Sequence, residues 1–268
     1  MTRAHTAERP LPHGIILEDY TDDEELGLLR SGKEADVHLI RRSGPAGACL
    51  LAAKRYRPAA ERGFKNDMAY RAHRRIDGLV RDGTRRRRPK QGRGLQVAMD
   101  KRTEFGRRKL EERWIQAEWD SLDALWQAGA PVPYPVERLD DGFLMEFVGD
   151  AEQAAPRLVD ARVAAVELPP LYEQVRAALR TFVGAGLVHA DLSPYNTLLW
   201  EGRIWIIDVP QAVELLTNED AMDFLHRDVC NIVAWFRRRG MDVDPEDLFA
   251  ELANAAFDVR MEDLYRAR

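Results

Sequence analysis

The sequence predicts an α+β fold with two lobes, in which a small antiparallel sheet precedes a mainly helical part. Short apolar runs separated by glycine and proline come first, over residues 25–54. Apolar residues at helical spacing dominate after residue 114, and they surround one short strand pair near residues 197–207. Strands first and helices afterwards, with no internal repeat, is an order typical of α+β folds.

The N-terminal part is expected to hold the sheet. Residues 1–17 have no apolar periodicity and predict a tail or a lightly tethered arm. Strands are predicted around residues 26–28, 37–39 and 50–54, with Gly32 and the Ser-Gly-Pro cluster at 43–45 between them. Residues 60–110 contain glycine- and arginine-rich segments with little to bury, so we expect part of this stretch to be mobile.

The C-terminal part is expected to be mainly helical. Helical spacing predicts a helix over 114–126, ended by Gly129, then a strand over 143–148, a helix over 171–183 and a helix over 222–236, ended by Gly240. Gly149 is the predicted lobe boundary. The predicted domains are a tail (1–17), an N-lobe (18–148) with a basic flexible insertion around 81–109, and a C-lobe (149–268).

Charge is unevenly distributed along the 268 residues, which hold 40 Lys and Arg, 45 Asp and Glu, and a net charge of −5. Residues 81–109 hold 12 of the basic residues against three acidic ones, so this segment carries +9 and the remainder −14. A mildly acidic protein with one basic segment indicates a local anionic partner, not a wholly cationic nucleic-acid binder. A solvated loop that only aids solubility is the alternative.

Cysteine content and hydropathy indicate where the chain acts. Cys49 and Cys230 are too few for a disulfide framework or a multi-thiolate zinc site, and they fit a reducing cytoplasm. The sequence shows no His, Cys and carboxylate spacing that indicates zinc. No charge-free apolar run approaches the roughly 18 residues of a membrane span, and the N-terminus lacks a signal peptide's apolar stretch. We therefore expect a cytoplasmic protein with no membrane partner.

The strongest chemical signal is the segment from His189 to Asp208. Asp191 and Asn196 stand on one short loop, and Asp208 follows an apolar strand, so a rigid strand pair can aim all three side chains. Mg²⁺ prefers oxygen ligands, which suits Asn196 and Asp208 together with phosphate oxygens. Asp191 could accept or orient the proton of an attacking hydroxyl. His189 is expected to support the loop through a hydrogen bond, and plain turn-forming roles for Asp191 and Asn196 are the alternative.

A second group of candidates lies in the strand-rich part. The turn over 31–37 contains a glycine, and backbone N–H groups of such a turn can face phosphate oxygens, although a plain hairpin turn is the default interpretation. Lys54 ends an apolar strand and resembles the strand lysine that kinases direct at phosphates, although a lone lysine in that position is usually just solvated. Glu118 lies on the following predicted helix and could pair with Lys54, although charge alone does not single it out among the acids there.

These segments together resemble the RIO family of atypical protein kinases, and within it the Rio-one subfamily. The motifs are Ser-Gly-Lys-Glu-Ala-Asp-Val at 31–37, Lys54, His-Ala-Asp-Leu-Ser-Pro-Tyr-Asn at 189–196 and Ile-Ile-Asp-Val-Pro-Gln-Ala-Val at 206–213. The resemblance runs from about Leu26 to Val233. It implies a trimmed two-lobed kinase fold, with no conventional activation segment.

The resemblance also implies roles for individual residues. Asp191 matches the catalytic aspartate and Asn196 the metal-binding asparagine. Asp208 matches the metal-binding aspartate, which in this family can also accept a phosphate in an ATPase cycle. Lys54 matches the ATP lysine, and Glu118 its partner. The other matches are the phosphate loop (Ser31, Gly32, Lys33, Glu34, Ala35 and Asp36), the gatekeeper (Met145) and the hinge that meets adenine (Glu146 and Val148).

The implied activity is phosphorylation of serine and threonine, with ATP and Mg²⁺, or Mn²⁺ in its place. The implied substrates are another protein and the chain itself. Two other functions stay open. One is an ATPase switch factor that binds ribosomal RNA or ribosomal particles, with residues 81–109 as the contact. The other is a small-molecule kinase of the aminoglycoside or choline type.

Overall fold

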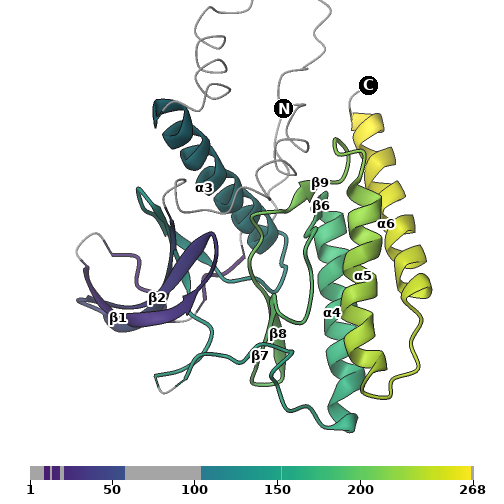
Figure 1. Ribbon diagram of the computed structural model, residues 1–268, viewed down its shortest axis with the longest axis horizontal. Helices are drawn as coiled ribbons and strands as arrows, with labels where there is room; N and C mark the ends of the chain where they lie inside the picture. The colour runs from purple at the N-terminus through teal and green to yellow at the C-terminus, as the bar shows by residue number, and fades with distance from the viewer. Residues whose placement is uncertain (1–8, 13, 19–20, 58–103, 152, 267–268) are drawn as a thin grey trace, which may run out of the picture.

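The computed structural model describes residues 9–12, 14–18, 21–57, 104–151 and 153–266. Figure 1 shows two parts: a β-sheet with helix α3 on one side, and helices α4, α5 and α6 side by side on the other, with the hairpin β7–β8 between them. The predicted two-lobed α+β architecture is confirmed. The predicted lobe boundary at Gly149 falls between β5 and α4 and stays a prediction.

The first part is built on a five-stranded antiparallel sheet with the order β1-β2-β3-β5-β4. Its strands are β1 (Asp22–Ser31), β2 (Ala35–Gly44), β3 (Gly47–Tyr56), β4 (Pro135–Arg138) and β5 (Gly142–Glu146). Apolar residues of three strands form a small core there, with Leu51 and Ala53 fully buried beside Ile40 and Leu144. The strands expected near residues 26–28, 37–39, 50–54 and 143–148 are therefore present.

Helix α3 (Glu104–Gln127) packs its last turns against this sheet. Leu125 and Trp126 are buried, and Trp119 meets the ring of Phe143 on β5 edge to face at 5.9 Å. The helix begins about three turns before Trp114, the residue at which the predicted helix starts. The end of the basic segment 81–109 thus belongs to α3, and the rest of it lies outside the described residues.

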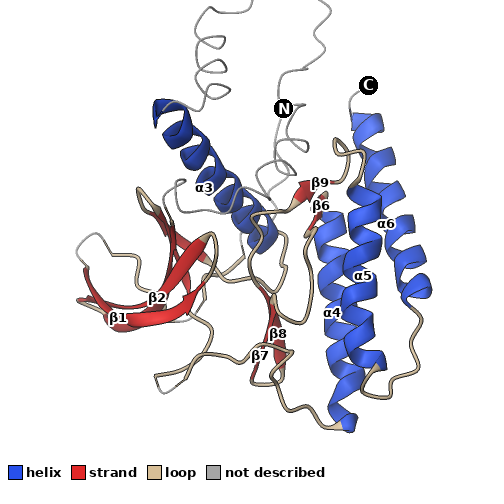
Figure 2. Cartoon of the chain, viewed as in Figure 1, coloured by secondary structure: helices blue, strands red, loops and turns tan. Residues whose placement is uncertain are grey.

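The second part consists of two short strand pairs and three long helices (Figure 2). The helices are α4 (Leu168–Gly184), α5 (Ala221–Arg237) and α6 (Pro245–Arg266), with the short 3-10 helix η1 (Ala165–Glu167) before α4. The strand pairs are β6 (Leu187–Val188) with β9 (Val213–Glu214), and β7 (Thr197–Trp200) with β8 (Arg203–Ile206).

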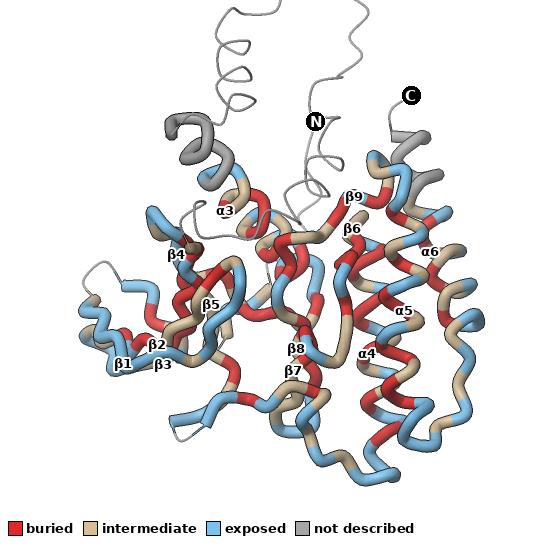
Figure 3. Tube along the Cα trace, in the orientation of Figure 1, coloured by how far each residue is buried: buried red, intermediate tan, exposed pale blue. Residues whose placement is uncertain are grey.

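The main core lies where α4, α5 and α6 face each other, as the buried stretches in Figure 3 show. Leu179 and Phe182 of α4 and Val229 and Phe236 of α5 are at most 1% exposed. These positions recur at helical spacing, as the sequence predicted. None of the helices in the described part of the chain is long and apolar enough to cross a bilayer.

The N-terminal arm contacts the rest of the fold. The Arg9 guanidinium donates to the carbonyl oxygens of Trp126 and Ala130 at 2.9 and 3.0 Å, and it lies over the Trp126 ring. Ile16 is buried. The end of α3 leaves carbonyl groups without intrahelical partners, and Arg9 occupies one of them. Arg9 and Ile16 therefore tether the described part of this segment to the fold.

Gly142, which is paired with Arg55 of β3, offers the first test. A Cβ atom at this residue would lie 1.9 Å from the carbonyl oxygen of Lys54 and 2.9 Å from its carbonyl carbon. Both atoms belong to the backbone, so Gly142→Ala must push the two strands apart. We expect the free energy of unfolding, measured by urea titration, to fall by about 1–3 kcal/mol.

Gly184→Ala is the matched control, because a Cβ there meets no atom within 4 Å. Since Gly184 ends α4, alanine should leave the stability unchanged or raise it by up to about 1 kcal/mol. Equal urea midpoints for wild type and Gly142→Ala would contradict the close approach of β5 to Lys54.

Candidate active site

A cavity of about 300 Å³ lies between the sheet and the loops that follow β6 and β8. Its polar lining comes from both parts of the molecule and includes Lys54, Asp191 and Asp208. Its apolar lining includes Val37, Leu122, Phe143, Met145, Ile207 and Val209. A volume of this size, with apolar walls and a few convergent charges, is typical of a small-molecule site.

The turn between β1 and β2 closes one side of this cavity. Gly32, Lys33, Glu34 and Ala35 contribute to the lining. The Gly32 amide donates to the Ala35 carbonyl at 3.0 Å, which makes the turn tight. Four of the six predicted phosphate-loop residues thus reach the cavity.

Ser31 and Asp36 are the two ends of the predicted phosphate loop. They lie outside the described cavity lining and stabilise the turn instead. The Arg57 guanidinium donates to Ser31 Oγ at 2.6 Å and to Asp36 Oδ1 at 2.8 Å. The hydrogen bond from Arg57 is the main reason that the pKa of Asp36 lies below its usual range. Arg57 therefore ties the two strand ends together, a role that the sequence did not indicate.

Lys54 is the centre of a buried ion-pair network. Its Nζ lies 2.5 Å from Glu118 Oε1 and 2.7 Å from Asp208 Oδ1. Lys54 and Glu118 are 7% and 2% exposed, whereas the Asp208 side chain is 47% exposed. The predicted Lys54–Glu118 pairing is confirmed. Lys54 thus links α3, the sheet and the loop after β8.

Burial and charge act against each other in this network. Burial alone lowers the pKa of Lys54, but the carboxylates of Asp208 and Glu118 outweigh it and raise the pKa above the usual lysine range. The Lys54 ammonium lowers the pKa of Asp208. Burial raises the pKa of Glu118 to about 7, and the charge of Lys54 limits that rise. At neutral pH, Lys54 is therefore protonated and Asp208 is ionised, whereas Glu118 is close to its pKa.

Asp191 and Asn196 are brought together on the loop after β6. The Asn196 side-chain amide donates to the Asp191 carbonyl oxygen at 2.9 Å and to Asp191 Oδ2 at 3.2 Å. Asn196 is buried, whereas Asp191 is exposed and lines the cavity. This arrangement directs the Asp191 carboxylate toward the cavity. Because the Asn196 side-chain nitrogen makes both hydrogen bonds, the side-chain carbonyl oxygen is the other polar atom of Asn196.

The backbone is strained next to both carboxylates. Ala190 and Asp208 have φ values of 64° and 66°, in the left-handed region that residues other than glycine rarely adopt. Such strain persists only where surrounding contacts hold it, and it is concentrated at functional sites. The contacts that hold Ala190 come from α5.

Asp228 on α5 anchors the Asp191 loop, and sequence reasoning missed it. It is fully buried, and its two carboxylate oxygens accept hydrogen bonds from the amides of Ala190 and Leu192, each at 2.8 Å. Arg227 donates to the Ala190 carbonyl. Burial raises the pKa of Asp228 to about 7, although both amide bonds oppose the rise. The sequence did contain a signal for it: Asp228 lies three residues after Leu225 and four before Ile232, on the apolar face of the helix.

His189 supports the same loop, as the sequence predicted. It is buried, its Nε2 lies 3.1 Å from the Ile207 carbonyl oxygen, and its Nδ1 accepts a hydrogen bond from the Asp191 amide. Burial lowers the pKa of His189, so the ring is neutral and donates from Nε2. His189 therefore joins the Asp191 loop to the residue that precedes Asp208.

The predicted gatekeeper and hinge residues occupy the end of β5 and the segment after it. Met145 lines the cavity. Glu146 pairs with Tyr134 through its own amide and its carboxylate, and the Val148 carbonyl accepts from the Ala155 amide at 2.9 Å. Glu146 and Val148 lie outside the described lining of the cavity.

Two arginines line the cavity in addition to the predicted residues. Arg30 lies at the end of β1, and Arg157 lies on a segment that bridges to Leu198 of β7. Burial lowers the pKa of Arg157, while the nearby Asp208 raises it. Their positive charge suits a polyanionic ligand. A single arginine in a loop carries no sequence pattern, so sequence reasoning had no signal for Arg157.

Two side-chain oxygens fit a hard divalent cation: one belongs to Asp208, which lines the cavity, and the other to Asn196, which lies outside the described lining. Lys54 engages Asp208 through Oδ1, so Oδ2 is the second oxygen of that carboxylate. The Asn196 carbonyl oxygen is the other side-chain donor. Carboxylate and carbonyl oxygens, completed by water and phosphate, are the ligands that Mg²⁺ prefers.

Comparisons with known proteins agree with this geometry. A family model described as the RIO domain matches residues 65–248, which is more than half of the chain. The chain is 38% identical over 136 residues to the RIO-type serine/threonine-protein kinase Rio1 of Haloferax volcanii, covering 51% of this chain and 46% of that protein. It is 38% identical over 133 residues to the serine/threonine-protein kinase rio1 of Dictyostelium discoideum, covering 49% of this chain and 23% of that protein.

A third relative is matched over more of its length. The chain is 32% identical over 135 residues to the RIO-type serine/threonine-protein kinase Rio1 of Thermoplasma acidophilum, covering 50% of this chain and 69% of that protein. The chain spans less than half the length of the Haloferax and Dictyostelium proteins. The family match over residues 65–248, the two-lobed fold and the gathering of Lys54, Asp191 and Asp208 around one cavity together show that this chain belongs to the RIO family.

Proposed function

We propose that this chain is an ATP- and Mg²⁺-dependent serine/threonine protein kinase of the RIO type that also phosphorylates itself. The observation that carries the proposal is the convergence of Lys54, Asp191 and Asp208 on a cavity of nucleotide-compatible size. Its relatives are named as serine/threonine-protein kinases, which supports the same reaction here.

Several polar residues of the cavity have parts in this reaction. Lys54, held by Glu118 at 2.5 Å, donates hydrogen bonds to the phosphates. Lys33 offers a cation from the β1–β2 turn on the other side of the cavity. Asp191 orients the attacking hydroxyl and accepts its proton. Phosphoryl transfer needs mainly positioning and charge stabilisation, so these few groups suffice.

Asp208 and Asn196 would hold Mg²⁺, which supplies neutralisation of the phosphate charge when bound. The phosphates would then be a third anionic partner of Lys54, besides Glu118 and Asp208. Because Lys54 keeps the pKa of Asp208 low, the carboxylate is ionised and ready for a cation throughout the physiological pH range.

Two further features support a cytoplasmic location and an anionic partner. The two cysteines are unpaired, which agrees with a reducing cytoplasm. The charge of +9 on residues 81–109 favours an anionic partner such as ribosomal RNA. Binding to RNA should then weaken steeply with salt, and it should weaken less steeply after neutralisation of the four arginines at 85–88.

Incubation with γ-labelled ATP and Mg²⁺, followed by mapping of labelled residues, tests the proposed function. We expect phosphate on serine or threonine of the chain or of an added protein. Asp208→Asn should abolish the label, because it removes a carboxylate oxygen from the cation site. Asp150→Asn, an exposed carboxylate outside the cavity lining, should label as the wild type does.

Other label distributions would contradict the proposal. Phosphate on Asp208 with release of inorganic phosphate, and none on serine or threonine, would instead identify an ATPase. Label on an added aminoglycoside or choline, with none on protein, would identify a small-molecule kinase.

A further inference from the structure

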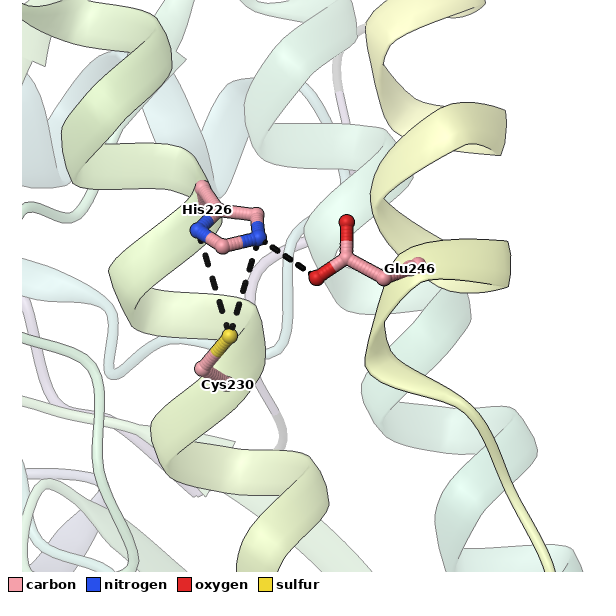
Figure 4. A group of neighbouring side chains, drawn as sticks. All are labelled: His226, Cys230 and Glu246. Carbon is pink, nitrogen blue, oxygen red and sulfur yellow. Dashed lines mark hydrogen bonds and ion pairs between the residues drawn. The ribbon is translucent and has the colours of Figure 1, made fainter.

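Three potential metal ligands meet on the far side of α5, away from the Asp191 loop. Figure 4 shows His226 and Cys230, one turn apart on α5, facing Glu246 on the first turn of α6. One ligand atom from each of the three residues lies within 4.8 Å of the other two. Asp228 lies two residues from His226, about 200° around the helix, so the three residues and the catalytic-loop anchor occupy opposite faces of α5.

The separations of these atoms suit a tetrahedral cation. In a zinc site the ligand atoms lie about 2.0–2.3 Å from the metal, which places them about 3.3–3.7 Å from one another. Cys230 Sγ is 3.8 Å from His226 Nε2. His226 Nε2 is 2.7 Å from Glu246 Oε1, a hydrogen bond that a cation would replace after the carboxylate moves by less than about 1 Å.

The surrounding contacts hold the ligands in position. The His226 ring packs edge to face against Phe249 of α6 at 4.8 Å. The Glu246 amide donates to Asp244 Oδ1 at 2.9 Å, which fixes the start of α6. The His226 and Glu246 side chains are 41% and 62% exposed, so a cation can enter from solvent without any rearrangement of the core.

We propose that His226, Cys230 and Glu246 form a binding site for one Zn²⁺ ion. A thiolate, an imidazole and a carboxylate are the ligand types that zinc combines in proteins, and a water molecule completes the tetrahedron. Mg²⁺ prefers oxygen ligands alone, so the thiolate distinguishes this site from the oxygen-lined cation site at Asp208 and Asn196.

Zinc binding at this position links α5 to α6 directly. The proton of the Cys230 thiol passes to solvent, and the sulfur binds as thiolate. The imidazole of His226 binds in its neutral form through Nε2, in place of its hydrogen bond to Glu246. Since residues 238–244 alone connect the two helices, the ion closes a short loop and stabilises the native pairing of α5 and α6.

Titration with Co²⁺, followed by displacement with Zn²⁺, tests the site on the full-length chain. Co²⁺ at a tetrahedral site with a thiolate gives a sulfur-to-metal charge-transfer band and visible d–d bands. We expect these bands in the wild type, and we expect Zn²⁺ to remove them. Zn²⁺ should also raise the melting temperature of the wild type.

Variants assign the bands to the three residues. Cys230→Ser should abolish the charge-transfer band. His226→Gln and Glu246→Gln should each weaken Zn²⁺ binding by more than the roughly 10–100-fold typical of losing an outer-shell partner. The matched control is Cys49→Ser, which removes the other cysteine and should keep the band. Asp208→Asn should keep it too, because the site at Asp208 contains no sulfur.

Three results would overturn the assignment. These are no charge-transfer band in the wild type, the same band in Cys230→Ser, and unchanged Zn²⁺ affinity in Glu246→Gln. The last variant replaces an exposed side chain, so its result does not depend on a folding defect. Circular dichroism spectra of all variants before titration verify that each is folded.

Discussion

Asp191→Asn should abolish most phosphoryl transfer while ATP still binds. The substituted amide keeps an oxygen that can accept the hydrogen bond from Asn196, which lies 3.2 Å from Asp191 Oδ2 in the native loop, but it cannot accept a proton. We expect kcat to fall by about 10²–10⁴-fold, a loss of roughly 3–5 kcal/mol of transition-state stabilisation. Initial rates of phosphoprotein formation and calorimetric titration with Mg²⁺-ATP measure the two effects separately.

Asp223→Asn is the control for the loss of one negative charge. Asp223 lies in the first turn of α5, is not fully buried and lies outside the described cavity lining. Its rate should equal the wild-type rate. If Asp191→Asn also kept the wild-type rate, Asp191 would not be the base, and the exposed carboxylate that lines the cavity would have only a structural role.

The sequence was most informative where chemistry and structure are local. Asp191 and Asn196 lie five residues apart on one loop, and Asp208 follows the paired strand, so their proximity follows from a hairpin of four-residue strands. Helices α4 and α5 were predictable because each presents one apolar face to the core. Lys54 and Glu118 were paired through the resemblance to a family, and their 2.5 Å contact confirms that pairing.

Residues whose role depends on long-range packing were not predictable. Asp228 is 36 residues from Leu192, and only the docking of α5 beneath the loop brings them together. Gly142 shows its importance only when β5 is placed against Lys54. His226 and Glu246 meet because α5 and α6 pack side by side after the turn at Gly240, and no fixed ligand spacing indicates that contact.

Weak periodicity in the sequence explains the remaining differences between the predicted and the observed helices and strands. The pair β6–β9 has two residues in each strand, too few for an alternation that could be recognised. In α3, Glu112 and Arg113 just before Trp114 are both exposed, so the apolar spacing that could be recognised starts only at Trp114. In both cases the backbone forms regular structure that leaves no hydrophobic pattern in the sequence.

Asp228→Asn should both destabilise the fold and slow the reaction. The native carboxylate accepts one amide hydrogen bond on each oxygen. Asparagine keeps one acceptor oxygen but turns an NH₂ group toward the second amide, so two buried donors face each other. We expect the free energy of unfolding at about pH 6 to fall by about 2–3 kcal/mol. Because the loop that carries Asp191 loses an anchor, kcat should fall by about 10²-fold.

The pH dependence separates the loss of this carboxyl group from general destabilisation. Burial raises the pKa of Asp228 from 3.8 to about 7 in the folded state. Between these values the native protein keeps a proton that the unfolded chain has lost, so this group's contribution to the free energy of unfolding decreases as pH rises from about 4 to about 7. The asparagine side chain of the variant does not titrate, so the stability difference between wild type and Asp228→Asn should shrink over that range.

Glu118, whose pKa is also raised to about 7 by burial, contributes a slope of the same sign. That slope is present in both proteins and therefore cancels from their difference. Urea titrations of the two proteins at half-unit steps from about pH 4.5 to 7.5 give the difference directly, with Asp223→Asn as the carboxylate control on the same helix. Parallel stability curves for wild type and Asp228→Asn would show that Asp228 is ionised in the native state across the range. A wild-type kcat for the variant would show that the two amide bonds do not position Asp191.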